Sequence, residues 1–334
     1  MAKYSIIMPV YNKERFVEKA IKSVQNQDIS DWEIVAVDDE SKDSSLDILN
    51  RIASEDNRVR VFSIKNKGVS NARNFALDRV EGEYITFLDA DDTFNAGLFA
   101  EYDSIINQYN PDIIFTDFDA VDEDGNVLNT VTSGLSTGFY EAGQVFPILA
   151  EKQRENGFFG FISNKIVHRS IITDNKIIFD VSIKCAEDLD FYIKVYRYIS
   201  NAYFSCFKSF NYVSHSENAY KTMVFDYYSQ MQIHIRFKNL ICDSGVLHEK
   251  GDILDQWITK EICCYIIEQL PDSRLAFYEK QKKLYENKAA MDAMTTHGLP
   301  MFKKIIILLA KAKMSTAQYM LLRAKSLIRR LVRR

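Results

Sequence analysis

The sequence has 334 residues and a net charge of −4; 47% of the residues are hydrophobic and 26% are charged, which is typical of a globular protein and excludes a disordered or collagen-like chain. Its length corresponds to about two domains. Five scattered cysteines without a Cys-x-x-Cys pair predict neither a disulfide framework nor a zinc site and favour a reducing cytosol. The sequence also predicts no membrane-spanning helix and no signal peptide, because no apolar run reaches about eighteen residues and the start lacks a cleavage pattern.

Residues 1–117 alternate short apolar runs with segments of helical periodicity. The runs predict strands at 4–10, 32–37, 59–64, 84–88 and 112–116, and the periodic segments predict helices at 14–24, 44–52, 69–80 and 98–109. Strands of this length separated by helices are typical of βαβ units and a parallel sheet. Because the strands are almost continuously apolar, we expect helices to cover both faces of that sheet.

The pattern loosens beyond residue 117. Residues 123–126 are typical of a hairpin turn, and the stretch 129–143, rich in Ser, Thr and Gly, predicts a mobile loop. A helix is predicted at 186–198, followed by two short strands at 203–207 and 210–213. From residue 226 to the C-terminus the sequence predicts helices.

Polar clusters follow three of the predicted strands at the points where the strands end. Asp38 and Asp39 follow the second strand, and Asp89 and Asp91 follow the fourth. Because the carboxyl ends of parallel strands form the ligand-binding edge of an open sheet, we expect these clusters to meet there. Paired carboxylates in a loop suit a hard divalent cation, Mg²⁺ or Mn²⁺, shared with a diphosphate. Helix capping, for instance by Asp92, is the alternative explanation.

Cationic residues lie between the two acidic loops. Lys65 precedes Gly68, which allows a tight turn, and Arg73 falls in the first turns of the next predicted helix. Arginine is well suited to phosphate recognition. We therefore expect Lys65 and Arg73 to face a bound diphosphate.

Five stretches together resemble the family-2 glycosyltransferases, which have the nucleotide-diphospho-sugar transferase fold called GT-A. They are residues 5–12, 37–43, 66–74, 87–92 and 186–191, in the order and approximate spacing of the family. The resemblance covers about residues 4–215 and fades after about residue 220. It implies an α/β fold of GT-A type, with a mostly parallel sheet flanked by helices, to which the sequence pattern after residue 226 adds a helical C-terminal region.

The resemblance and the sequence pattern together set the expected domains. We expect a glycosyltransferase domain at 1–220, with a nucleotide-binding half at 1–117 and an acceptor half at 118–220. A helical region at 221–300 and a tail at 301–334 would follow it.

The resemblance also implies roles for individual residues. The first nucleotide-binding loop of the family is matched by Pro9, Tyr11 and Glu14. The loop that contacts the base and ribose is matched by Asp38 and Asp39, and the residue near the donor phosphates by Arg73. The metal motif is matched by Asp89 and Asp91, with Asp91 as the direct ligand. Asp188, beside Glu187, matches the catalytic base of an inverting transfer, in which it would take the proton of the acceptor hydroxyl. On spacing alone, two acidic residues in the first turn of a helix are the alternative.

Two further residues each have two explanations. Some relatives place a histidine near His215, facing the metal or the diphosphate, whereas a lone histidine on a loop is more often structural. Lys165 follows Asn164 in a stretch that resembles a family segment beside the acceptor cleft, and an exposed loop lysine is the alternative.

Charge is distributed unevenly along the chain. Residues 302–334 hold ten Lys and Arg and no Asp or Glu, whereas the other 301 residues carry 32 basic and 46 acidic side chains, a net charge of −14. Pro300 and a capping box at 315–318 predict two helices in the tail. Their apolar stripes are expected to contain Phe302, Ile305, Ile306 and Leu309, then Leu321, Ala324, Ile328, Leu331 and Val332. Such a segment predicts binding to an anionic membrane surface; nucleic acid and ordinary packing on the body are the alternatives.

Together these features predict an inverting, metal-dependent glycosyltransferase of surface polysaccharide synthesis. The expected partners are a nucleotide-diphosphate sugar, with UDP as the expected nucleotide, a glycan or lipid-linked acceptor, and the cytoplasmic face of the cell membrane, but no nucleic acid. The expected cofactor is Mn²⁺ or Mg²⁺. One alternative, a sugar nucleotidyltransferase, would need a glycine-rich loop after the first strand, and residues 11–15 contain no glycine. The other is a nucleotide-binding scaffold anchored by the tail.

Overall fold

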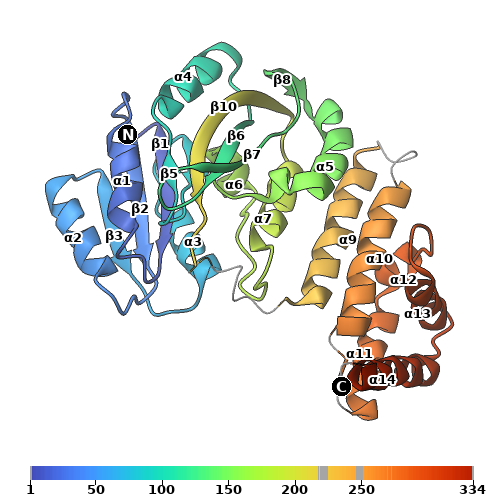
Figure 1. The fold of residues 1–334 in the computed structure, drawn as a ribbon. Helices are drawn as coiled ribbons and strands as arrows, with labels where there is room; N and C mark the ends of the chain where they lie inside the picture. Colours follow the sequence, from blue (N-terminus) through green and yellow to red (C-terminus); the bar gives the residue numbers. More distant parts are fainter. Residues whose placement is uncertain are drawn as a thin grey trace. The chain divides into compact units, whose positions relative to one another are not determined.

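The structure is a computed structural model that describes residues 2–216, 218, 225–245, 251–268, 270–271 and 273–332. The chain divides into two compact units, Met1–Met223 and Val224–Arg334, each of which is described by itself (Figure 1). In the described residues, the first unit contains a ten-stranded sheet with helices around it, and the second contains helices.

The sheet of the first unit has the order β3-β2-β1-β4-β9-β6-β10-β5, with β7 on β6 and β8 on β10. Its strands are β1 (Tyr4–Val10), β2 (Trp32–Asp38), β3 (Val59–Ser63), β4 (Tyr84–Phe87), β5 (Thr93–Phe94), β6 (Ile113–Val121), β7 (Val127–Val131), β8 (Gly138–Glu141), β9 (Lys165–His168) and β10 (Asn201–Val213). The first four strands of that order pair in parallel, as do β6 and β10. β9 runs antiparallel to both β4 and β6 and so joins the two parallel parts.

Helices cover this sheet because its central strands are apolar on both faces. They are α1 (Val17–Gln25), α2 (Ser45–Glu55), α3 (Val69–Leu77), α4 (Leu98–Tyr109), α5 (Ala142–Asn156), α6 (Arg169–Asp174) and α7 (Glu187–Tyr196). α3 packs on β1 and β2, and α1 packs against α2 and β5. α1 buries Val17, Ala20, Ile21 and Val24, the spacing from which this helix was predicted.

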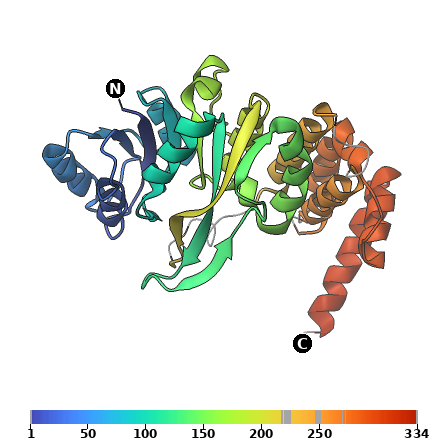
Figure 2. The ribbon, with the colours of Figure 1, turned by 90° about the horizontal axis from the view of Figure 1, so that it is seen from above.

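The second half of this unit is more regular than its sequence pattern suggests. The predicted hairpin turn at 123–126 is confirmed: it joins β6 to β7, and Asp122 N donates to Asn126 O at 3.0 Å. The prediction of a mobile loop at 129–143 is wrong in part, because β7 and β8 pair with β6 and β10 there. The two short strands predicted after residue 203 are one strand, β10, which runs beside β6 and continues through two register shifts near Lys208 (Figure 2).

The helices of the second unit surround an apolar cluster. They are α9 (Tyr227–Asp243), α10 (Gly251–Glu268), α11 (Arg274–Glu286), α12 (Lys288–Ala293), α13 (Met301–Lys311) and α14 (Ser315–Val332). The cluster draws on all six of them, through side chains such as Met231, Ile258, Phe277, Ala290, Ile306 and Leu322. Among the described residues, no helix has both the length and the hydropathy to cross a membrane.

The tail helices contribute to this cluster, so the predicted apolar stripes are partly wrong. Ile306 and Leu322 are buried, whereas Ile305 and Ala324 are exposed. The predicted capping box is also wrong, because the buried Gln318 side chain donates to Ile306 O at 2.9 Å. Three other predicted stripe side chains lie outside the described ones: Ile328, Leu331 and Val332.

The turn before β4 leads to a prediction about packing. Gly82 N donates to Ser5 Oγ at 2.8 Å, and a Cβ at Gly82 would lie 2.6 Å from that oxygen and 2.7 Å from Ser5 N. Gly82→Ala should therefore lower the free energy of unfolding by about 1–3 kcal/mol, the usual cost of overpacking. Denaturant titration measures this loss.

Gly143→Ala in α5 is the matched control, because nothing lies within 4 Å of the Cβ that it would add. Alanine also favours a helix over glycine, so this variant should be as stable as the wild type or slightly more stable. Equal stability of the two variants would contradict the described contact of Gly82.

Candidate active site

One buried arginine joins two segments that are far apart in the sequence. Arg73 lies on α3, and its side chain is 3% exposed. Its Nη1 donates to Asp188 Oδ1 at 2.6 Å, and its Nη2 donates to Asp89 Oδ1 at 2.9 Å. Glu187 Oε1 lies 3.9 Å from Nη1. The guanidinium thus holds the loop after β4 against the first turn of α7, and it gathers three of the predicted site carboxylates.

Burial and charge act in opposite directions on this group of side chains. Burial disfavours the charged form of Arg73, but the carboxylates around it, Asp188 first, raise its pKa above the ordinary value. Burial raises the pKa of Asp188 to about 7, while Arg73 acts to lower it and Glu187 adds to the rise. A carboxylate that loses its proton near neutral pH is suited to general-base catalysis.

The start of α7 fixes the position of the acidic pair. Ala186 precedes the helix in the left-handed conformation, with φ 61°, and Glu187 and Asp188 lie in the first turn. Negative charge is favourable at a helix N-terminus, as the alternative explanation of the pair holds. The hydrogen bond from Arg73 to Asp188 is an additional contact that this alternative does not require.

A second cluster centres on Asp91, in the same loop. Asp91 Oδ2 lies 2.6 Å from Lys13 Nζ and 2.9 Å from His215 Nε2. The His215 side chain is fully buried and stacks on Phe16, with the ring centroids 4.4 Å apart. Two of the three residues predicted as metal ligands, Asp91 and His215, are therefore in contact, and the third, Asp89, is bound to Arg73.

The neighbouring Asp92 has a structural task. It is buried and accepts a hydrogen bond from Val213 N at 2.9 Å, so it fastens the end of β10 to the loop after β4. Burial, and then Asp91 and Asp89, raise its pKa well above the ordinary range. The suggestion that Asp92 caps a helix is wrong, because α4 begins only at Leu98.

Two carboxylates lie where β2 ends. Both oxygens of one accept hydrogen bonds, and one oxygen of the other accepts none from the described residues. Asp39 accepts from Lys67 N at 3.0 Å and from Gly68 N at 2.8 Å, so both of its oxygens hold the loop before α3. Gly68 has a φ of 93°, which glycine adopts at no steric cost. Asp38 is 1% exposed, and its Oδ1 is buried without a hydrogen-bond partner in the described part of the chain.

The other predicted donor residues lie around these loops. Pro9 is part of β1, Tyr11 is exposed, and Glu14 Oε2 accepts from Ser44 N at 2.9 Å. A cavity of about 320 Å³ adjoins them, lined by Asn12, Glu14, Arg15, Phe16, Lys42 and Asp43. Lys65 is exposed between β3 and α3.

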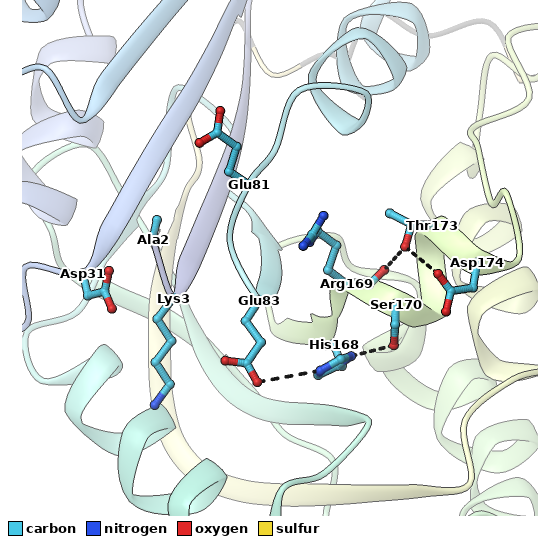
Figure 3. A pocket seen from close by; sticks show the side chains of 10 residues that line it. All are labelled: Ala2, Lys3, Asp31, Glu81, Glu83, His168, Arg169, Ser170, Thr173 and Asp174. Carbon is cyan, nitrogen blue, oxygen red and sulfur yellow. Dashed lines mark hydrogen bonds and ion pairs between the residues drawn. The ribbon is translucent and has the colours of Figure 1, made fainter.

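A larger cavity, about 560 Å³, lies away from these residues (Figure 3). Its lining includes Lys3, Glu83 and His168, which lie at the amino ends of β1 and β4 and at the end of β9. His168 Nε2 faces Glu83 Oε1 at 3.8 Å, and acidic and basic groups are mixed around the cavity. It contains none of the predicted site residues.

The sequence left two explanations for Lys165, one beside the acceptor cleft and one on an exposed loop. The alternative explanation, an exposed loop lysine, is wrong: the side chain is buried in β9 and donates to Phe161 O and to Asn164 Oδ1, the latter at 2.5 Å. Its Nζ lies 4.1 Å from the centre of the Tyr192 ring on α7. Burial lowers the pKa of Lys165 well below its ordinary value, while Asp188 acts to raise it. A second basic side chain, besides Arg73, therefore interacts with the acidic start of α7.

The donor set fits a divalent cation only in part. Within the described residues, no group of three His, Cys, Asp or Glu side chains is arranged as a metal site. Asp91 and His215 offer an oxygen and a nitrogen 2.9 Å apart, about the separation of two neighbouring ligands of an octahedral ion. Asp89 is engaged with Arg73. A cation at this position would therefore find two protein donor atoms close together, and it would need further donors from a ligand such as a diphosphate.

The buried guanidinium leads to a prediction about stability. Arg73→Met should lower the free energy of unfolding by about 3 kcal/mol or more at pH 8, because it leaves Asp188 and Asp89 without their cation. Arg51→Met is the control, since Arg51 is half exposed and pairs with Glu18 on the surface, where an ion pair contributes about 0–1 kcal/mol.

The pH dependence sharpens this comparison. Below pH 7 Asp188 takes up a proton, so less uncompensated charge remains and the loss in Arg73→Met should shrink at pH 5. Denaturant titrations at the two pH values measure it. A loss no larger than that of Arg51→Met would contradict the role of Arg73.

The chain is similar to known proteins both in sequence and in fold. Residues 5–174 match the family model described as Glycosyl transferase family 2. The chain is 32% identical over 198 residues to EpsJ of Bacillus subtilis (strain 168), an uncharacterized glycosyltransferase, with 58% of this chain and 56% of EpsJ covered. It is 26% identical over 267 residues to the poly(ribitol-phosphate) beta-N-acetylglucosaminyltransferase TarS of Staphylococcus aureus (strain Mu50), with 78% and 44% covered. It is 40% identical over 99 residues to the GalNAc(5)-diNAcBac-PP-undecaprenol beta-1,3-glucosyltransferase of Campylobacter jejuni, with 29% and 32% covered.

These matches span about half of each relative's length, or less. Among solved structures, S. aureus TarS 1-349 in complex with UDP-GlcNAc aligns with a TM-score of 0.70 at 18% identity, covering 97% of this chain and 91% of that one. This likeness confirms the predicted α/β fold of GT-A type with a helical C-terminal region. Since the family model matches half of the chain, the protein belongs to glycosyl transferase family 2.

Proposed function

We propose that this protein transfers a sugar from a nucleotide-diphosphate sugar to a saccharide acceptor, with inversion at the anomeric carbon. The observation that carries the proposal is the hydrogen bonding of Arg73 to both Asp188 and Asp89 at the carboxyl edge of the parallel sheet. A carboxylate with a pKa near neutral thus lies beside a cation and the acidic loop after β4. The UDP-GlcNAc and UDP held by the aligned TarS structures support a UDP-sugar as the donor.

In this mechanism Asp188 is the general base. Its carboxylate accepts the proton of the acceptor hydroxyl while that oxygen bonds to the anomeric carbon. On the opposite face, the bond from the anomeric carbon to the diphosphate oxygen breaks, and the nucleoside diphosphate leaves. Glu187 supports this role because its charge helps to keep the pKa of Asp188 high.

We propose that Asp38 and the loop with Pro9, Tyr11 and Glu14 bind the nucleoside of the donor. The unpartnered Oδ1 of Asp38 supports this, because an N–H or hydroxyl of the nucleoside would satisfy it. Asp39 would act through the loop that it holds. Lys65 and Arg73 are assigned to the diphosphate, for which arginine geometry is well suited.

We further propose that Mn²⁺ or Mg²⁺ is held by Asp91 and His215, with Asp89 nearby. The 2.9 Å contact between Asp91 and His215 supports this pairing. When bound, the ion would neutralise charge that develops on the leaving diphosphate. In the structure, Lys13 supplies the positive charge at Asp91.

The acceptor that we propose is a glycan or lipid-linked saccharide, used at the cytoplasmic face of the cell membrane in surface polysaccharide synthesis. The name of the C. jejuni relative specifies an undecaprenol-linked saccharide, and that of TarS specifies poly(ribitol phosphate). The basic, acid-free segment 302–334 supports attachment to an anionic membrane.

The role of Asp188 predicts how activity depends on pH. Because the base must be ionised, kcat/KM should fall as pH drops below about 7, by about tenfold per pH unit. Asp188→Asn should lower transfer by about 10²–10⁴-fold while UDP affinity changes little. Release of UDP from a panel of UDP-sugars measures the rate, with water as the acceptor.

Asp47→Asn provides the matched control, because Asp47 is an exposed aspartate on α2 outside the site. It should retain wild-type rates. A rate that stays flat from pH 8 to pH 5, or near-normal turnover by Asp188→Asn, would remove Asp188 from the mechanism. Wild-type protein that binds UDP but releases none from any sugar of the panel would favour a nucleotide-binding role without transfer.

The metal assignment makes a separate prediction about binding. Chelation of divalent ions with EDTA should weaken UDP binding to the wild type by at least about tenfold, or about 1.4 kcal/mol. In Asp91→Ala the same treatment should change UDP affinity little, because the proposed ligand is gone. Isothermal titration of UDP with and without Mn²⁺ measures both. Wild-type affinity that is indifferent to EDTA would show that donor binding does not use a metal.

A further inference from the structure

Helix α13 has an exposed apolar ridge opposite its buried face. Met301 is 72%, Ile305 40% and Leu308 56% exposed, and Ala312 follows at the same spacing of four, three and four residues. At 3.6 residues per turn these positions lie along one side of the helix. The opposite side holds Ile306, Ile307 and Ala310 and is buried in the apolar cluster of the second unit.

This ridge differs from the apolar side chains found singly on most protein surfaces. It continues along the whole of α13, and exposed methionines follow it: Met314 is 51% exposed and Met320, on α14, is 63% exposed. Contiguous exposed apolar surface usually marks a site of interaction. The folding of the second unit does not account for it, because that unit already uses the other side of α13 for its core.

The charge around the ridge indicates what covers it. No Asp or Glu occurs from Ala293 to the C-terminus, and ten Lys and Arg lie in that segment. Lys304 and Lys311 flank the ridge, where their aliphatic stems can follow it while their amines reach outward. A second copy of this surface would bring like charges together. An anionic lipid surface would accept both the apolar side chains and the lysines.

We propose that α13 lies in the interface of an anionic membrane with its Met301–Leu308 ridge directed into the lipid. The inference deepens the membrane attachment proposed above and rests on it. It also replaces the apolar stripe predicted from the sequence, because Ile306 of that stripe is used inside the protein.

The test is sedimentation of the full chain with vesicles of phosphatidylglycerol and phosphatidylcholine. Replacing both ridge side chains (Ile305→Ser with Leu308→Ser) should weaken partitioning by about tenfold or more, since interfacial binding scales with buried apolar area. The melting temperature should not fall, because both side chains are exposed. Leu275→Ser is the matched control: Leu275 is a 69% exposed leucine on α11, outside the acid-free segment, and its loss should change nothing.

Ionic strength separates the ridge from general charge attraction. At about 0.5 M salt the wild type should keep part of its binding, because apolar contacts do not depend on salt, and the double variant should lose it. If the double variant binds as the wild type does, the ridge proposal is overturned while attachment through basic residues stands. If it instead changes only the oligomeric state, the ridge is a self-association surface and the proposal is equally overturned.

The test is also independent of the proposed catalysis. UDP binding, measured on the same variants, should stay at the wild-type level. Wild-type protein that ignores anionic vesicles at low salt would overturn both the attachment and the ridge, and would leave sugar transfer untouched.

Discussion

A guanidinium that has almost no access to water must be neutralised by the protein itself, and most of the site geometry follows from how Arg73 meets this requirement. Its partners come from the loop after β4 and from the start of α7. Because an unpaired buried charge costs several kcal/mol, these segments are held in one arrangement before any ligand arrives. An aromatic wall supports the arrangement: the Phe179 ring lies 5.3 Å from the guanidinium and stacks on Phe191 of α7.

The sequence predicted the parallel half of the fold well because its signals there are strong. β1 and β2 are apolar at nearly every position and buried on both faces, so strand and burial coincide. Beyond residue 117 the signals are weak for physical reasons. β7 is exposed over most of its length and is held by pairing with β6, which sequence composition does not encode. Lys208, at the register shifts of β10, interrupts the apolar pattern and makes one strand look like two.

The carboxylates of the candidate site were predictable because acidic clusters follow two strands whose carboxyl ends meet at one edge of the sheet. The basic side chains around these carboxylates were harder to predict. Lys165 is buried with a depressed pKa, which is rare for lysine, so composition favours the wrong explanation. Lys13 was not singled out at all, since nothing in its own neighbourhood predicts that it meets Asp91 from another loop. In the tail, the sequence periodicity predicts the helix α13 but not which of its faces is buried, because apolar side chains lie on both faces.

The hydrogen bond from Val213 N to Asp92 has a mechanical consequence. β10 begins at Asn201, which pairs with Glu141 in the half expected to meet the acceptor, and it ends beside Asp92 and just before His215. A continuous strand fastened at both ends transmits displacement along its axis instead of absorbing it. β10 therefore connects the two halves of this unit, as β9 and the hydrogen bond from Arg73 to Asp188 also do. One strand thus contacts β8 at its start and ends two residues before His215, so the position of that imidazole depends on how β10 is seated in the sheet.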